Sequence, residues 1–206
     1  NLTERLYRDI HGNLTMVPWE DEDTGEEIYP GRARATFRYN DQNKLIEEAY
    51  FGKDGGAATH PDGYARATHS YDLRGNRVRT VYYSSSTQLA VVKHGYSALE
   101  WRYDDQGHEL DIQYFDRNGK PVSSKNGYAR ICRMHDQYGR VIEERVLDSY
   151  GKPTTGKGGF YRTKRKYDSR GRLIESAAFG PDDQPVINDD GYHIIRYAYD
   201  LRGNIS

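Results

Sequence analysis

The sequence is poor in cysteine, in net charge and in long hydrophobic runs. Its 206 residues contain one cysteine, Cys132, so an intrachain disulfide framework is excluded. There are 30 Lys and Arg against 31 Asp and Glu, and the net charge of −1 offers nucleic acid no basic field. No apolar run approaches the roughly 18 residues that a membrane-spanning helix needs. We therefore expect no nucleic-acid partner and no membrane insertion.

Hydrophobic side chains are also scarce. They make up 35% of the chain, while 30% of residues are charged, which is poor material for one large buried core. Aromatic residues nevertheless reach 13%, with 19 tyrosines, so the composition is not that of a disordered chain. A tyrosine ring covers a neighbour while its hydroxyl stays in water. This composition favours thin sheets with little interior.

A dipeptide repeats through the chain at a fixed spacing. Tyr or a substitute is followed by Asp or Asn, and each copy begins 32 residues after the previous one: Tyr39-Asn40, Tyr71-Asp72, Tyr103-Asp104, His135-Asp136, Tyr167-Asp168 and Tyr199-Asp200. A constant period of this length predicts a repeat array, in which each unit is one supersecondary element that packs on its neighbours.

Each unit has the same order of strand and turn signals. It opens with Gly, as at Gly63, and a strand of about nine residues then leads to the Tyr-Asp pair. An Asp-x-x-Gly turn follows, in which Asp bonds the turn backbone and Gly takes the left-handed conformation. Asn43 fills that position in the first regular unit, because Asn tolerates it. A second strand and a short third strand near Pro153 or Pro185 complete the unit.

The predicted fold is all-β, built of tandem antiparallel hairpin or meander repeats that form a solenoid or one long curved sheet. We expect a degenerate first repeat over residues 1–30 and one continuous array over residues 31–206. Its units lie near residues 31–62, 63–94, 95–126, 127–158, 159–190 and, in part, 191–206. Because the chain starts without Met and stops inside a unit, we expect a fragment of a longer array or a processed chain.

The sequence contains little candidate chemistry. Its seven histidines show no metal-ligand spacing, and no Ser or Cys has an identifiable partner for nucleophilic catalysis. His135 stands beside Asp136, where a general base is one interpretation and a flat polar replacement for tyrosine is the favoured one. The acidic segment 20–27 lacks the spacing of a helix-flanked calcium loop, so we expect a solvated hairpin tip. We predict a protein that is not an enzyme and uses no metal or cofactor.

The aromatic residues are the best candidates for a binding surface. They form two ladders across the units, which are Tyr50, Tyr82 and Tyr114 at one position and Phe51, Tyr83, Phe115 and Phe179 at the next. Alternation along a strand places the ladders on opposite faces, so one faces the interior and the other is open to sugars or a partner protein, unless both serve only to pack hairpins. The predicted binding residues are Tyr82, Tyr83, Trp101, Tyr103, Tyr114 and Phe115.

Two resemblances follow from these motifs. Tyr71-Asp72-Leu73-Arg74-Gly75-Asn76 and Tyr167-Asp168-Ser169-Arg170-Gly171-Arg172 resemble the core of the YD repeat of Rhs-type bacterial proteins, which implies strips of β-hairpins that curl into a shell. Tyr114-Phe115-Asp116-Arg117-Asn118-Gly119 is similar to the hairpins of choline-binding and glucan-binding repeats, which implies a solenoid that holds ligands between aromatic side chains. Both imply a bacterial β-hairpin array.

Two functions agree with these observations. We predict a non-enzymatic β-repeat module of a larger bacterial protein that presents an extended binding surface to carbohydrate or protein. The alternative is a structural spacer or shell segment, as the Rhs-type resemblance implies. The single cysteine and the many tyrosines are compatible with the secreted or cell-surface location that we expect. Exposed end strands leave backbone groups unpaired, so we also expect edge-strand self-association.

Overall fold

The computed structural model describes residues 1–20, 24–200 and 202–205, which contain fourteen strands. Residues 21–23 of the predicted acidic hairpin tip lie outside the described residues. The strands are β1 (Leu2–Leu6), β2 (Val17–Glu20), β3 (Glu27–Arg32), β4 (Arg34–Tyr39), β5 (Leu45–Phe51), β6 (Arg66–Tyr71), β7 (Arg77–Tyr83), β8 (Ala98–Tyr103), β9 (Glu109–Phe115), β10 (Arg130–His135), β11 (Val141–Leu147), β12 (Arg162–Tyr167), β13 (Leu173–Phe179) and β14 (Ile194–Arg196). No helix in these ranges is long and apolar enough to cross a membrane.

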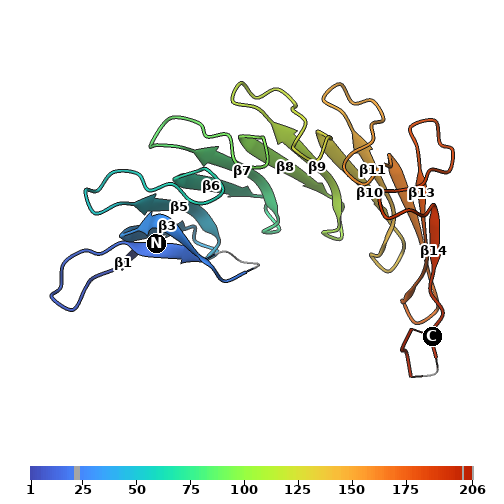
Figure 1. The fold of residues 1–206 in the computed structure, drawn as a ribbon, viewed down its shortest axis with the longest axis horizontal. Helices are drawn as coiled ribbons and strands as arrows, with labels where there is room; N and C mark the ends of the chain where they lie inside the picture. The colour runs from blue at the N-terminus through green and yellow to red at the C-terminus, as the bar shows by residue number, and fades with distance from the viewer. Residues whose placement is uncertain (21–23, 201, 206) are drawn as a thin grey trace. The chain divides into compact units, whose positions relative to one another are not determined.

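The strands form one long open sheet and one small one. Twelve strands follow one another in the order β1, β4, β5 and then every strand in chain order to β14, while β2 pairs with β3 in a separate two-stranded sheet (Figure 1). Neighbouring strands pair antiparallel, as where Arg34 on β4 faces Phe51 on β5. The predicted all-β antiparallel meander is therefore confirmed.

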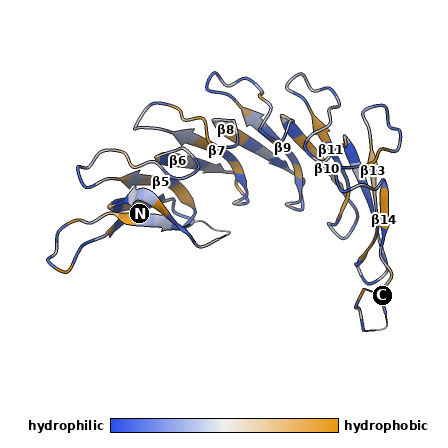
Figure 2. Cartoon of the chain, in the orientation of Figure 1, coloured by the Kyte–Doolittle hydropathy of each residue, from blue (hydrophilic) through white to orange (hydrophobic). Residues whose placement is uncertain are grey.

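The chain divides into two compact units, each with its own small core. The first comprises Asn1–Glu100 and Phe115–Lys120. Its core contains Trp19, Ala35, Tyr50, Ala58, Tyr64, Ala67, Ala90 and Val92. The second comprises Trp101–Tyr114 and Pro121–Ser206, and its buried hydrophobic residues are Ala129, Ile131, Val146, Ala177 and Ala178. Hydrophobic and hydrophilic residues are mixed along the strands (Figure 2), as the composition predicts.

The hairpin turns have the predicted chemistry. Asp72 Oδ1 accepts hydrogen bonds from the backbone N–H groups of Arg74 and Asn76, at 2.9 and 2.8 Å. Gly75 donates its N–H to the Asp72 carbonyl at 3.1 Å and has a φ of +84°, which a Cβ would penalise. Asn43 takes the same left-handed region at φ 57°, as expected from its place in the repeat. The repeated Asp therefore fixes the turn that closes each hairpin.

The predicted third strand is reduced to a single bridge in each unit where it is described. Leu147 bridges Pro153, and Phe179 bridges Pro185. Phe51 and Tyr83 make the same single bridge, to Ala57 and Leu89, so the short pairing does not depend on proline. One further bond anchors each segment, as where Thr154 N donates to the Val146 carbonyl at 3.3 Å. These segments fold back onto the sheet without joining it as strands.

The repeated tyrosine joins each hairpin to the one before it. The Tyr71 hydroxyl donates to the carbonyl of Leu45, 26 residues earlier, at 2.8 Å. The same bond recurs, again across 26 residues, from Tyr167 to the Val141 carbonyl at 2.9 Å and from Tyr199 to the Leu173 carbonyl at 2.8 Å. Because the acceptor belongs to the previous hairpin, this bond ties neighbouring units together and explains why tyrosine recurs with the period.

A second joint is formed by charged side chains on the face opposite Tyr50 and Tyr82. Arg66 donates to Glu47 of the previous hairpin at 2.9 Å, and its guanidinium lies 3.8 Å from the centre of the Tyr83 ring. Arg34 covers Phe51 at 4.0 Å, and Arg162 covers Phe179 at 4.8 Å. A guanidinium over an aromatic face is attracted to it. This face is therefore covered by arginines stacked on the second aromatic ladder.

The ion pairs between hairpins differ in how deeply they are buried. In one of them the acidic and basic residues have exchanged places. Asp111 is 4% exposed, and Arg130 Nε donates to its two carboxylate oxygens at 2.9 and 2.7 Å. Arg102 also contacts Asp111 at 3.2 Å. In the preceding unit the signs are reversed, because Arg79 stands at the position of the acid and pairs with Glu100 on β8. Each acid, or its arginine replacement, thus finds an opposite charge on the next hairpin.

The tyrosine bond can be tested by removing one oxygen atom. Tyr167→Phe keeps the ring and deletes the bond to the Val141 carbonyl, so we expect the free energy of unfolding to fall by about 1 kcal/mol. Urea unfolding followed by circular dichroism measures this change. Tyr150→Phe is the matched control, because Tyr150 is 86% exposed, and should change stability by less than about 0.5 kcal/mol. Equal effects of the two variants would contradict the role given to the hydroxyl.

The buried and exposed ion pairs should differ in energy. Asp111→Asn leaves the guanidinium of Arg130 without its carboxylate in a mostly buried place, and we expect a loss of about 3 kcal/mol in stability. Glu100→Gln removes a carboxylate that is 39% exposed, so its expected cost is below about 1 kcal/mol. Both variants are measured by urea unfolding at one salt concentration. A smaller loss for Asp111→Asn would contradict this ranking.

Candidate functional site at the histidine in the tyrosine position

The six predicted binding residues lie on β7, β8 and β9, and all of them are partly buried. The Tyr82 ring lies between the rings of Tyr64 and Tyr96, with centroid distances of 5.0 and 6.2 Å. Tyr83 points to the other face, where Arg66 covers it. The two ladders thus take opposite faces, as predicted, and both of these rings are used in packing.

Two of the other four predicted residues also have ring contacts. The Tyr114 ring lies 6.2 Å from that of Tyr128, and Arg79 lies 6.0 Å from the centre of the Phe115 ring. Trp101 and Tyr103 are half-buried on β8. The structure gives Tyr114 and Phe115 packing roles, and the binding of carbohydrate or protein by the six aromatics stays a prediction.

The repeat of joining tyrosines is broken at His135. An imidazole lacks the reach of a phenol, and its Nδ1 is buried without a hydrogen-bond partner. Tyr71 bonds the carbonyl of Leu45, 26 residues earlier in the sequence. The equivalent carbonyl for His135, also 26 residues earlier, is that of Glu109. The joint between these two hairpins therefore lacks the bond that Tyr71, Tyr167 and Tyr199 make, and a space opens beside the shorter side chain.

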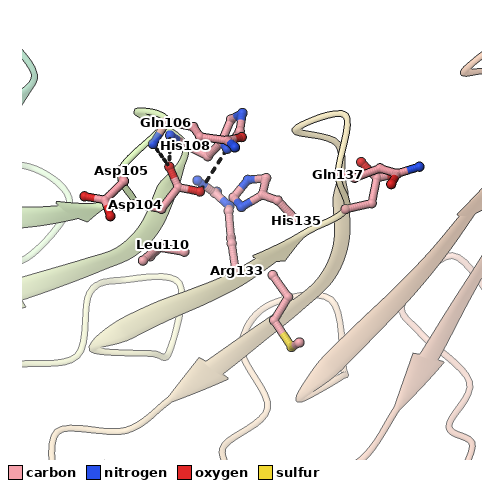
Figure 3. A pocket seen from close by; sticks show the side chains of 10 residues that line it. Asp104, Asp105, Gln106, His108, Leu110, Arg133, His135 and Gln137 are labelled. Atoms are coloured by element: carbon pink, nitrogen blue, oxygen red, sulfur yellow. Dashed lines mark hydrogen bonds and ion pairs between the residues drawn. The ribbon is translucent and has the colours of Figure 1, made fainter.

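That space is a pocket of about 570 Å³ between two hairpin ends of the second compact unit. Asp104, Asp105, Gln106, His108 and Leu110 line it from one hairpin, and Arg133, Met134, His135, Asp136 and Gln137 from the next. Figure 3 shows Asp104 hydrogen-bonded to His108, with His135 and Arg133 facing them. The Asp104 Oδ2 to His108 Nδ1 distance is 2.9 Å, and the two imidazole rings stack with centroids 5.2 Å apart.

The protonation of these groups follows from their surroundings. Desolvation of Asp104 opposes its ionisation, but hydrogen bonds from the backbone and side chain of His108 and from the backbone of Gln106 prevail and lower its pKa to about 2. Burial lowers the pKa of His135 below its usual value, and the neighbouring His108 lowers it further. Arg133 is neutralised by Glu144 at 2.7 Å and by Glu109. His135 is therefore favoured in its neutral form at pH 7.

The histidine pair occupies a place that other units fill with arginine and tyrosine. Arg140 lies 4.8 Å from the Tyr167 ring centre, and Arg172 lies 4.4 Å from that of Tyr199. His108 and His135 hold the equivalent positions, 32 residues before Arg140 and Tyr167. His108 Nε2 would lie 2.3 Å from a Cβ built on Gly139, so His108 rests directly on the next turn. The pair is a variant of the joint between turns.

The pocket has a base and an orienting carboxylate without a reaction partner. His108 and Asp104 have the geometry of a base held by a carboxylate, but the residues that line the pocket include no Ser, Thr or Cys. Within the described ranges no three His, Cys, Asp or Glu side chains are placed to hold a metal ion. The arrangement is a polar hollow whose two charged groups have partners: Arg133 pairs with Glu144, and Asp104 is hydrogen-bonded to His108. Such a hollow is suited to packing between hairpins.

Sequence analysis singled out His135 but missed its neighbours His108, Asp104 and Arg133. The signal for His108 was present in the period, because Lys44, Asn76, His108, Arg140 and Arg172 recur at one position just after the turn glycine or Asn43. Four of them meet the glycine of the next turn, as Lys44 does at Gly75, while the Asn76 side chain bonds Asp72 of its own turn. A comparison of this position across units predicts the contact; it does not predict the pocket.

Comparisons with known proteins give no family for this chain. No protein-family model matches it, and no curated protein matches it. Among solved structures, one described as "Crystal Structure of TcdB2-TccC3-TEV" aligns with 98% of this chain and 11% of its own, at 15% identity and a TM-score of 0.38. Another, "Crystal Structure of TcdB2-TccC3 without hypervariable C-terminal region", aligns with 97% of this chain and 13% of its own, at 13% identity and a TM-score of 0.24. The chain thus spans a small part of both.

Restoring the tyrosine should repair the weak joint. His135→Tyr places a phenol within reach of the Glu109 carbonyl, so we expect a gain of about 1 kcal/mol in the free energy of unfolding at pH 7. It should also reduce the sensitivity to acid. The unfolded chain binds a proton at a higher pH than His135 in the folded chain, so stability falls as pH drops below 6.5.

The measurement is urea unfolding at several pH values between 7 and 5 at constant ionic strength. Tyr167→His is the matched reverse change, because it places histidine in an intact joint. It should lower stability at pH 7 and add sensitivity to acid. Parallel pH profiles for the natural chain and His135→Tyr would contradict the account of His135.

Proposed function

We propose that this chain is a scaffold segment, a non-enzymatic run of β-hairpins that builds a continuous wall in a longer bacterial protein. The observation that carries the proposal is the recurrence of the tyrosine joint, because Tyr71, Tyr167 and Tyr199 each bond a carbonyl 26 residues earlier. Such joints allow a sheet to be extended by whole units. A secreted or surface location and the absence of a cofactor belong to the same proposal.

The use of the aromatic side chains also favours a scaffold over a binding module. Tyr82 is sandwiched between Tyr64 and Tyr96, and Tyr83 lies under Arg66. Ligand-binding aromatics need an open ring face, and these faces are already in contact. Strands β1 and β14 end the order of the long sheet, so edge pairing with another chain accompanies this proposal.

A scaffold of interchangeable units should tolerate the loss of one unit. Deleting residues 127–158 joins Asn126 to Gly159 and brings Arg162 to the place of Arg130, opposite Asp111. We expect this variant to remain folded, with a circular dichroism spectrum of the same shape and cooperative unfolding. Deleting residues 127–142, half a unit, breaks the register and should abolish folding. Unfolding of both deletion variants would contradict interchangeable units.

A screen of the intact chain against a glycan array and envelope polysaccharides distinguishes the scaffold proposal from the alternative, a carbohydrate-binding module. A scaffold predicts no saturable binding. Saturable binding that is lost in Trp101→Ala or Tyr114→Ala, with the unfolding midpoint retained, would replace the scaffold proposal by carbohydrate recognition. The Tyr150→Phe variant controls for changes that do not touch the predicted surface, because Tyr150 lies in an exposed turn.

A further inference from the structure

Two positions in the ladder of Tyr50, Tyr82 and Tyr114 have lost the ring, Val146 and Ala178. Ala35 faces Tyr50 and Ala67 faces Tyr82 across their hairpins, so each pair combines a small and a large side chain. The second compact unit has two equivalent pairs: Ile131 and Val146 are both large, whereas Thr163 and Ala178 are both small. Tyr82 fills the space between Tyr64 and Tyr96, and the residues equivalent to these two are Phe160 and Tyr192.

The space left by the missing ring is a pocket of about 210 Å³. Phe160 and Tyr192 line it, together with Thr163, Arg165, Ala178 and Asp190. A cavity of roughly 150 Å³ is large enough for benzene when its lining is apolar. The pocket between Phe160 and Tyr192 is therefore large enough for one six-membered ring, in the place that tyrosine occupies two and three units earlier.

The lining also contains polar groups that no protein partner satisfies. Thr163 is 8% exposed, and its Oγ1 is buried without a hydrogen-bond partner. Arg165 has no ion-pair or hydrogen-bond partner among the described residues. The preceding unit also has an arginine there, but Arg133 pairs with Glu144, and the residue equivalent to Glu144 beside Arg165 is Ser176. A buried hydroxyl without a partner is costly, and an unpaired guanidinium is a ready donor to an anion.

We propose that this pocket, named here the ring slot, binds a small aromatic carboxylate. The ligand ring takes the place of the missing tyrosine ring between Phe160 and Tyr192, where offset or edge contacts between aromatic rings are favourable. Arg165 pairs with the carboxylate, and Thr163 Oγ1 bonds a polar substituent. Asp190 stands at the exposed side, where it accepts a hydrogen bond from a ligand hydroxyl. The ring slot is independent of the scaffold role.

The probe is 4-hydroxybenzoate, titrated into the ¹⁵N-labelled intact chain and followed by amide chemical shifts. We expect saturable, millimolar binding, with shifts concentrated at residues 160–165, 176–178 and 188–193. Ala178→Tyr supplies the residue found at Tyr50 and Tyr82, fills the ring slot and should abolish binding. Arg165→Phe supplies the residue found at Phe37 and should weaken binding at least tenfold, a ratio typical of losing one charge-assisted hydrogen bond.

Both variants place residues that other units of this chain already contain, and their unfolding midpoints report that they fold. Tyr150→Phe, at an exposed turn, should bind like the natural chain. Glucuronate separates a sugar carboxylate from an aromatic one, and we expect it to bind at least tenfold more weakly. The proposal is overturned by the absence of saturable shifts, by unchanged binding in folded Arg165→Phe, or by tighter binding of glucuronate than of 4-hydroxybenzoate.

Discussion

The hydrogen bond from a tyrosine hydroxyl to a carbonyl of the previous hairpin sets the spacing on which the other contacts depend. A sheet with so little interior gains limited stability from apolar burial, so neighbouring hairpins need specific contacts to stay in register. Tyr71 reaches Leu45 on one side of the joint, and Arg66 reaches Glu47 on the other. The turn fixed by Asp72 holds Tyr71 at the strand end from which this bond is made.

Most of the architecture could be predicted from the sequence, because each rule recurs in every unit. Gly75, Asn43 and Asp72 predict the turns through backbone conformation alone, and strand alternation predicts opposite faces for Tyr82 and Tyr83. The third strand was predicted too long, since each of these segments makes only one bridge, with or without proline. The cover of Arg66 over Tyr83 was not predicted, because it depends on a contact between residues 17 positions apart on adjacent strands.

Pockets in this sheet arise where the repeat loses bulk. His135 replaces a tyrosine and leaves a hollow beside His108, and Ala178 replaces a tyrosine and leaves the ring slot. A single sequence shows both substitutions, but it does not show whether neighbours move in to fill the space. At Val146, another position of the same ladder, Ile131 opposite it is large, so the pair remains buried. We therefore expect any ligand-binding site at positions where the residue differs from the one that the repeat has in other units.

The reversed ion pair of Arg79 and Glu100 helps to determine which hairpins of the array pair with each other. Identical joints would let a hairpin dock one unit too far along the chain, a misassembly that costs a repeat protein little. Here such a slip sets Glu47 of β5 against Glu100 of β8, or Arg79 of β7 against Arg130 of β10, so like charges meet in either case. One inverted ion pair thus disfavours a one-unit slip at the joints that involve Arg79 or Glu100.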